Sequence, residues 1–125
     1  ISNNDGASSS IFDFGDDSKK ENLKMVSSYK LRSKKIDTFF EENQLSVSDY
    51  DFWVMDIQGA ELSALKGADK SLNQCKYIYV EISEGDFYKG AAQWNELREY
   101  LNNLNFVNLW KPQSKHTDVL FVKND

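Results

Sequence analysis

Residues 51–68 read DFWVMDIQGAELSALKGA, and they predict a strand, a tight turn and a helix in that order. The apolar run ends in Asp56, as expected where a buried strand leaves a sheet. Gly59 opens the turn, because glycine accepts both a positive φ and a close backbone approach. Apolar residues then recur at helical spacing, at Leu62, Leu65, Ala68 and Leu72. Such a unit is typical of the start of a β-α-β crossover.

Three more strands and one more helix are predicted after this unit. Strands are predicted at residues 76–82, 106–110 and 118–123, where apolar residues are nearly contiguous. A helix of about four turns is predicted between the first two of these strands. Its apolar stripe consists of Trp94, Leu97, Leu101 and Leu104. The only proline, Pro112, lies in the last connection, where a missing backbone donor does no harm.

The N-terminal part of the chain predicts less regular structure. Residues 1–22 are rich in Ser, Asn, Asp and Gly around an apolar island at residues 11–14, which indicates loop with at most one short strand. Residues 25–31 predict an edge strand. Residues 33–44 predict a helix capped by Ser33 that docks on a sheet. The docking face consists of Ile36, Phe39 and Phe40.

Strands that alternate with helices predict an α/β fold. Their short connections imply crossovers, and therefore a largely parallel sheet with helices on both faces. The last two strands are separated by only about seven residues, which is too few for a helical crossover and predicts an antiparallel hairpin at one edge. A length of 125 residues suits one core, so we expect residues 1–125 to belong to a single domain.

Composition excludes several classes of protein. A net charge of -5 and a pI of about 4.9 argue against nucleic acid as a partner. The sequence has no run of the roughly 20 apolar residues that a membrane span needs, so no membrane partner is expected. One cysteine, Cys75, and one histidine, His116, rule out an internal disulfide and a metal cage of these residues, and no metal is predicted. A lone thiol in an acidic chain indicates a cytoplasmic protein.

Acidic residues end both central strands. Asp56 ends the first strand, with Gln58 and Gly59 behind it, and Glu81 ends the second. Ligands of open α/β sheets lie beyond the carboxyl ends of the strands, where two carboxylates can orient a hydroxyl, accept its proton or hold a hard cation. Alternatively, both acids only cap the turns that follow them. His116, just before the last strand, is either a general base or a surface residue.

A longer pattern runs through this region without a gap, at Asp56, Gln58, Gly59, Ala60, Glu61, Leu62, Leu65, Lys66, Gly67 and Ala68. With an apolar strand on either side, the second ending in Glu81, it resembles the signature of the FkbM-type methyltransferases. Likenesses to that family extend over nearly all of the chain. They are SNNDGASSSI at residues 2–11, Ile36-Asp37, the tyrosine-glycine element at residues 87–91 and the closing strand at residues 118–122.

The resemblance implies a Rossmann-like sheet and S-adenosylmethionine-dependent methyl transfer to a hydroxyl of a sugar or natural product. It implies that Asp56, Gln58 and Gly59 lie at the methionine end of the cofactor. Glu81 and the loop through Tyr88 would face the acceptor, a small molecule or glycan, and His116 is assigned to the same side. Asp56 or Glu81 is the candidate base for the hydroxyl proton, while the protein aligns the nucleophile with the methyl group.

The resemblance covers the second half of the family's domain. The sequence contains no Gly-x-Gly, and the opening strand with its glycine-rich turn has no counterpart. We therefore expect a partial domain that lacks its first strands and leaves the strand at residues 51–56 unpaired on one side, which predicts a homodimer through this edge. Two alternatives remain: a non-catalytic α/β remnant serving as an interaction module and, by fold analogy alone, a nucleotide-sugar or other binding domain.

Overall fold

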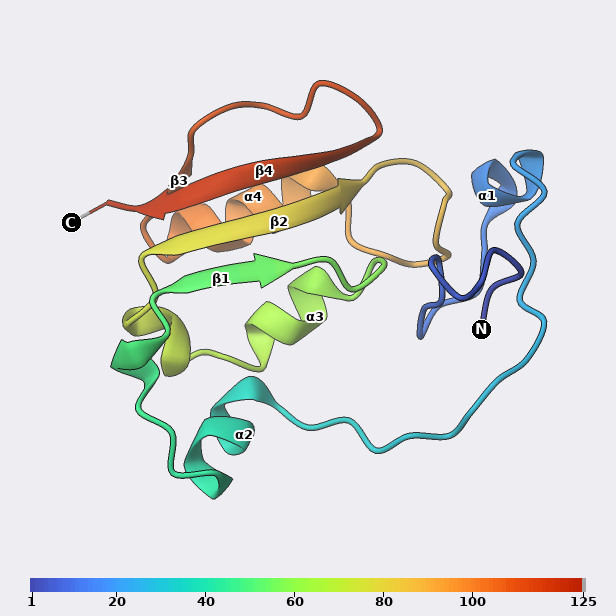
Figure 1. The fold of residues 1–125 in the computed structure, drawn as a ribbon. Coiled ribbons are helices and arrows are strands. Elements are labelled where there is room, and N and C mark those ends of the chain that lie inside the picture. The colour runs from blue at the N-terminus through green and yellow to red at the C-terminus, as the bar shows by residue number, and fades with distance from the viewer. Residues whose placement is uncertain (125) are drawn as a thin grey trace.

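Four strands form one sheet in the order β1-β2-β4-β3 (Figure 1). The computed structural model describes residues 1–124. Its strands are β1 (Phe52–Met55), β2 (Tyr77–Ser83), β3 (Phe106–Asn108) and β4 (His116–Lys123). Its helices are α1 (Asp16–Lys20), α2 (Ile36–Glu42), α3 (Glu61–Lys66) and α4 (Trp94–Asn103), with short 3-10 helices η1 (Val47–Asp49) and η2 (Ser71–Asn73). The predicted mixture of strands and helices is confirmed.

Two of the three strand pairs are antiparallel, so the prediction of a largely parallel sheet is wrong. β1 and β2 pair in parallel, whereas β4 pairs antiparallel with both β2 and β3. It follows that β1, β2 and β3 run in the same direction. β4 inserts between β2 and β3 and takes the backbone hydrogen bonds that a parallel pair would have formed. The predicted antiparallel hairpin of the last two strands is confirmed.

One face of the sheet carries the main core. Alternate residues of β2 and β4 point to this face, because side chains alternate along a strand. They pack with the apolar stripes of α3 and α4 in one cluster. Its fully buried members include Leu65, Ile78, Val80, Leu101, Val119 and Phe121. Both helices therefore cover the same side of the sheet.

Within residues 1–124, the opposite face of the sheet is open, so the prediction of helices on both faces is wrong. Strand alternation places Phe52, Val54, Tyr77 and Val107 on this open face, and all four are exposed. The reason is that α3 and α4 share a single apolar partner, the core face. Aromatic and β-branched residues thus remain in contact with water.

The N-terminal segment packs against the loop after β2. Phe14 forms an apolar cluster with Phe87, Tyr88 and Ala91, and it makes an isolated β-bridge with Tyr88. The apolar island at residues 11–14 therefore packs on the protein without forming a strand. The segment also contains α1, a helix that the sequence did not predict.

The edge strand predicted at residues 25–31 is not formed. Met25 makes one isolated bridge with Ser2, and residues 26–35 are exposed and belong to neither a helix nor a strand. A strand needs a neighbour that accepts its hydrogen bonds, and the described part of the chain places none beside this segment. In Figure 1 it runs as a cyan trace along the outside of the molecule, between α1 and α2.

The helix predicted at residues 33–44 is α2, which begins at Ile36. Lys35, and not Ser33, occupies its N-cap and makes no side-chain cap. Asp37 anchors the helix, because its carboxylate accepts hydrogen bonds from Ser71. Phe40 stacks on Trp53 of β1, whereas Phe39 remains exposed. Farther along the chain, α4 has ten residues and is shorter than predicted, and β3 ends at Asn108.

Candidate functional site

The carboxyl ends of β1 and β2 bring Asp56 and Glu81 together. Met55 pairs with Val80 in parallel register, so the next residue of each strand is one of the two acids. The side-chain amide of Gln58 joins them. It donates a hydrogen bond to Asp56 Oδ1 and a longer one, 3.5 Å, to Glu81 Oε2. The structure thus places Asp56, Gln58 and Glu81 together at this end of the sheet.

The turn after β1 places Gln58 between the acids. Gln58 and Gly59 both have positive φ, 54° and 95°. A Cβ at Gly59 would lie 3.0 Å from Ala91 Cβ and 3.2 Å from Tyr88 Cδ2, so glycine supplies both the conformation and the close approach expected of it. Glu61 stabilises the turn, because its carboxylate accepts hydrogen bonds from the backbone N–H groups of Ile57 (2.9 Å) and Gly59 (3.3 Å).

Glu61, rather than Asp56 or Glu81, thus accepts the backbone donors of this turn. The alternative interpretation, in which the two strand-end acids only cap the following turns, receives no support from the hydrogen bonds of residues 1–124. Asp56 is exposed at the surface and Glu81 is half-buried beside it. The two carboxyl groups are therefore available to a ligand at the end of the sheet.

Burial raises the pKa of Glu81 to about 7, and the neighbouring carboxylates of Asp56 and Glu61 raise it in the same direction. A carboxyl group with this pKa exchanges its proton near neutral pH. Such a group is suited to accept a proton from a bound hydroxyl. It is also a group whose charged form a nearby cation would favour, because attraction to a positive charge offsets the repulsion from Asp56.

Tyr88 supports the cluster from the loop after β2. Its hydroxyl donates a hydrogen bond to the side-chain oxygen of Gln58 and lies 3.3 Å from the carbonyl oxygen of Ser8. Burial raises the pKa of Tyr88 to about 12, so its hydroxyl stays protonated and remains a donor. Ser10 adds a further contact, since its hydroxyl donates to the carbonyl oxygen of Gln58 at 2.6 Å. The N-terminal segment therefore holds the backbone of Gln58, while Tyr88 holds its side chain.

His116 lies apart from this cluster. It begins β4 opposite Ser83, whose hydroxyl is 3.1 Å from His116 Nδ1. The Phe87 ring contacts both predicted acceptor-side residues, with its centroid 5.0 Å from the Tyr88 ring and 4.2 Å from the imidazole. The structure therefore does not bring Tyr88 and His116 into direct contact.

A surface hollow lies next to His116. This hollow of about 410 Å³ is lined by Asp17, Glu84, Phe87, Ser114, Lys115 and His116, among others. By contrast, the enclosed cavity beside Glu81 measures about 10 Å³, which is room for one water molecule at most. The hollow combines one aromatic ring with charged and hydroxyl groups, which can form hydrogen bonds to a polar organic ligand.

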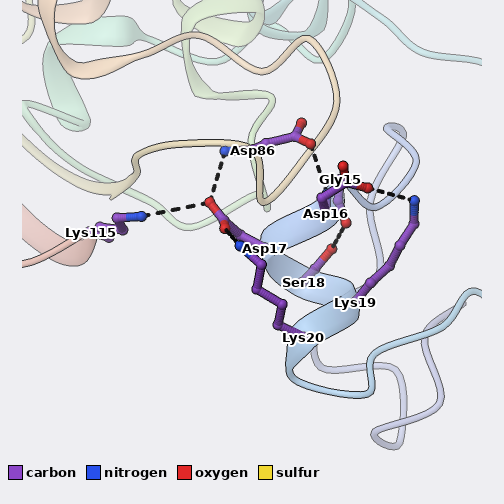
Figure 2. A network of polar contacts seen from close by, with 8 residues as sticks. All are labelled: Gly15, Asp16, Asp17, Ser18, Lys19, Lys20, Asp86 and Lys115. Atoms are coloured by element: carbon purple, nitrogen blue, oxygen red, sulfur yellow. Dashed lines mark hydrogen bonds and ion pairs between the residues drawn. The ribbon is translucent and has the colours of Figure 1, made fainter.

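A polar network holds the wall of this hollow (Figure 2). Asp17 accepts a hydrogen bond from the Asp86 backbone N–H at 3.2 Å and lies 3.7 Å from Lys115 Nζ. The Asp86 carboxylate in turn accepts the Asp16 backbone N–H at 2.7 Å. Gly15 permits this approach, because a Cβ there would lie 2.0 Å from the Asp86 carbonyl oxygen. The network joins α1 to the loop after β2.

Sequence reasoning missed Asp17 and Gly15 as parts of this region, whereas it placed the loop of Phe87 and Tyr88 on the acceptor side. One local signal was present, because Asp16-Lys19 and Asp17-Lys20 are opposite charges at a spacing of three, as in a helix. The contacts from Asp17 to Asp86 and to Lys115 join residues far apart in the chain, and no local pattern reports them.

The chain matches the model of the methyltransferase FkbM domain over residues 1–107. It belongs to the FkbM methyltransferase family. The match includes the turn of Asp56, Gln58 and Gly59 as well as Glu81, so the family membership indicated by the sequence pattern is confirmed.

This FkbM family member is also similar to the 2-O-methyltransferase NoeI of Sinorhizobium fredii. The two are 28% identical over 90 residues, which are 72% of this chain and 36% of that protein. The chain therefore spans about a third of the length of the curated relative that it matches. The comparison with solved structures gave no match.

Residues 1–124 contain no group of three or more His, Cys, Asp or Glu side chains arranged to hold a metal ion. Over the same residues, no helix is long and apolar enough to cross a membrane.

Proposed function

We propose that this chain contributes two parts of an S-adenosylmethionine-dependent O-methyltransferase site. One part contains the acids that would bind the methionine end of the cofactor, and the other would contact the acceptor. The observation that carries the proposal is the pairing of Asp56 with Glu81 through Gln58, in a surrounding that raises the pKa of Glu81 to about 7. Family membership supports the reaction class. The similarity to a 2-O-methyltransferase supports a hydroxyl group as the acceptor, and we propose that this hydroxyl belongs to a sugar or natural product.

The residues present fit the cationic part of the cofactor. S-adenosylmethionine carries an ammonium group and a sulfonium group, and either one would offset the repulsion between Asp56 and Glu81. Asp56, which is exposed, would hold the methionine end together with Gln58 and the backbone of Gly59. The enclosed cavity of about 10 Å³ next to them is too small for the nucleoside. The fit thus concerns the methionine end alone.

The chain's own residues would position the acceptor and move its proton. When bound, the cofactor supplies a methyl group with a sulfur leaving group that keeps the bonding electron pair. Glu81, with Asp56 beside it, would accept the hydroxyl proton as the oxygen forms its bond to carbon. Gln58 would keep both carboxylates in place, and Tyr88 would keep Gln58 in place. Phe87 and His116 would contact the acceptor from the hollow.

Calorimetry with S-adenosylmethionine on the 125-residue chain tests the cofactor half of the proposal. We expect binding that weakens at least about tenfold in Asp56→Asn, because the amide cannot neutralise a cation. Glu99→Gln is the matched control, since Glu99 is an exposed carboxylate on α4, away from the strand ends. Equal affinities of wild type and Asp56→Asn would contradict the assignment of Asp56.

Transfer of a labelled methyl group to hydroxyl acceptors tests the catalytic half. Loss of a general base typically costs about 10² to 10⁴ in rate, so we expect Glu81→Gln or Asp56→Asn to fall in this range. The Glu99→Gln variant should keep the wild-type rate. Unchanged turnover in both strand-end variants would eliminate Asp56 and Glu81 as bases.

A second candidate function is a non-catalytic interaction module. The observation that favours it is the open sheet face with exposed Phe52, Val54, Tyr77 and Val107. A wild-type chain that associates with itself but binds no S-adenosylmethionine in calorimetry would support this function over methyl transfer. For either function we propose a reducing, cytoplasmic location, because Cys75 is buried and burial raises the pKa of its thiol to about 11.

A further inference from the structure

A second surface hollow, termed the Trp94 hollow, adjoins the one beside His116. It measures about 460 Å³, and its lining includes Trp94, Lys111 and Gln113. Three further residues line both hollows, namely Glu84, Ser114 and Lys115. Each volume lies in the range of about 300–1,000 Å³ that is usual for ligand clefts. Because the two hollows share lining residues and both open to the surface, one elongated ligand can extend over both.

The fold places the Trp94 hollow at the ligand end of the sheet. α4 begins at Trp94, after the loop that leaves β2, and residues 109–115 join the end of β3 to the start of β4. β2 and β3 run in the same direction, so both segments lie at the carboxyl ends of these strands. Open α/β sheets bind their ligands at this end, which is also the end of Asp56 and Glu81.

Hydrogen bonds hold the connection at residues 109–115 in place. The Glu84 backbone N–H donates to the Lys115 carbonyl oxygen at 2.7 Å. Toward the other end of the connection, the Trp110 indole N–H donates to the Asp118 carbonyl oxygen at 2.9 Å. This wall of the Trp94 hollow is therefore ordered before a ligand binds, which reduces the entropic cost of binding.

Trp94 provides an aromatic surface in a fixed position. Its ring packs against Phe121 of β4, with 5.8 Å between the ring centroids, and it is partly buried against the main core. The rest of the side chain is free to contact a ligand in the hollow. The face of an aromatic ring carries partial negative charge, which attracts the C–H groups of a sugar ring. Gln113 and Ser114 add an amide and a hydroxyl, which can form hydrogen bonds to sugar hydroxyls.

The charge of the Trp94 hollow favours an anion. The connection between β3 and β4 contains Lys111 and Lys115 and no acid, in a chain whose net charge is -5. The acid of the lining is Glu84, and its carboxylate accepts the Trp94 backbone N–H at 2.5 Å. Its negative charge thus faces the N-terminus of α4, where the helix dipole offsets it. The two ammonium groups can therefore attract a negatively charged group of a ligand.

Asp17 does not cancel the charge of the lysines. Its carboxylate lies 3.7 Å from Lys115 Nζ and 2.8 Å from Lys20 Nζ, so two ammonium groups share one carboxylate. The Lys115 side chain is 71% exposed, and its flexible stem lets the ammonium group turn toward an anion in the Trp94 hollow. A net positive charge thus remains between the two hollows.

We propose that the Trp94 hollow binds an anionic sugar unit of the acceptor, next to the unit whose hydroxyl receives the methyl group. Trp94 would contact the sugar ring, and Lys111 and Lys115 would bind its carboxylate or phosphate. The neighbouring unit would lie in the hollow beside Phe87 and His116. This inference rests on the proposed methyl transfer, and it narrows the acceptor to an acidic glycan of at least two units.

An NMR titration of the isotope-labelled 125-residue chain tests the Trp94 hollow. The probes are sodium glucuronate, glucose 6-phosphate and glucose. We expect the signals of the Trp94 indole N–H and of the Lys111 and Gln113 amides to shift. At least one charged sugar should bind about tenfold more tightly than glucose, because glucose leaves both ammonium groups without a partner. The tighter of the two identifies the anionic group, whereas equal affinities of all three sugars would overturn the proposal.

A double variant assigns the charge to the two lysines. Lys111→Met/Lys115→Met keeps most of each aliphatic stem and removes both ammonium groups. We expect its affinity for the charged sugars to fall to its affinity for glucose. Lys66→Met is the matched control, because Lys66 is exposed on α3 and lines neither hollow. The charged sugars binding the double variant as tightly as the wild type would contradict the assignment.

Inorganic phosphate separates a sugar site from a simple anion site. We expect it to bind more weakly than the charged sugars, because it makes no contact with the Trp94 ring. Phosphate that shifts the same signals with the same affinity would assign the hollow to a free anion and overturn the sugar unit.

The titration contains no S-adenosylmethionine, so it separates this inference from the proposed function. Binding of a charged sugar at the Trp94 hollow, without methyl transfer to any acceptor, would support the hollow and contradict the proposed function. Methyl transfer to an acidic disaccharide with the same KM in the wild type and in Lys111→Met/Lys115→Met would support the proposed function and overturn the anionic unit.

Discussion

The hydroxyl of Tyr88 donates a hydrogen bond to the side-chain oxygen of Gln58, and this contact joins the loop after β2 to the turn after β1. Gln58 uses its amide nitrogen for Asp56 and Glu81, so its two ends serve different partners. The orientation of the amide is thereby fixed by residues on three separate segments. The loop after β2 and the carboxylate pair are therefore linked through the side chain of Gln58.

Replacing Tyr88 by Phe should loosen the turn without unfolding the protein. Loss of one part-buried hydrogen bond costs about 1 kcal/mol in the free energy of unfolding. Amide hydrogen exchange at residues 57–59 should become faster, because Gln58 loses a contact that holds it. Tyr100→Phe is the control, since its hydroxyl bonds to Leu65 and Asp69 and not to the turn at residues 57–59. Unchanged exchange at residues 57–59 in Tyr88→Phe would show that the contact does not hold the turn.

Glu81 should make the protein less stable as the pH rises. Its pKa is about 7 in the folded state against an ordinary value of 4.5, so the folded protein binds the proton more tightly. The contribution of this group to stability is therefore fully present below about pH 4.5 and is lost as the pH rises through 7. Glu81→Gln removes this dependence, and because the group is half-exposed we expect a gain of only about 1 kcal/mol at pH 8.

The measurement is the difference in unfolding free energy between wild type and Glu81→Gln by urea titration from pH 4 to pH 8. The difference cancels the carboxylates whose pKa is lowered, such as Asp37, which shift stability in the opposite direction. A difference that does not change with pH would show that Glu81 has an ordinary pKa.

Gly59→Ala should be more costly than Gly90→Ala. Both glycines have positive φ, 95° and 77°, which costs an L-residue about 1–2 kcal/mol. At Gly59 the new methyl group also meets Ala91 and Tyr88 within 3.3 Å, whereas at Gly90 it meets nothing within 4 Å. We expect losses of roughly 3 and 1 kcal/mol by chemical denaturation. Equal losses would mean that the loop of Tyr88 moves away freely.

Asp17→Asn should release the loop after β2 from α1. The Asp86 backbone N–H donates to Asp17, and we expect this amide to exchange faster with solvent in the variant. Asp16→Asn is the matched control, because the Asp16 side chain bonds to Lys19 on its own helix and not to the loop. Similar exchange at Asp86 in the two variants would show that the network in Figure 2 does not order the wall of the hollow.

Local patterns in the sequence predicted the elements around the site well. The apolar runs of β1 and β2, the helical spacing after Gly59 and the acids at the strand ends all depend on neighbouring residues, and each is found in the structure. The meeting of Asp56 and Glu81 followed as well, because two consecutive strands joined by one helix pair in parallel.

The tertiary structure decided how the strands are paired and which side of the sheet is covered. β4 lies between β2 and β3 because residues 116–123 pair with residues 77–83, a choice among distant partners that no local period encodes. The same holds for Tyr88, whose hydroxyl reaches Gln58 and Ser8 from 30 and 80 positions away. Local patterns and backbone hydrogen bonds thus determine the type of each element and place an acid at the end of each central strand. Burial of a shared apolar face determines which distant elements meet. It is this tertiary packing that brings Tyr88 and Ser10 into contact with Gln58.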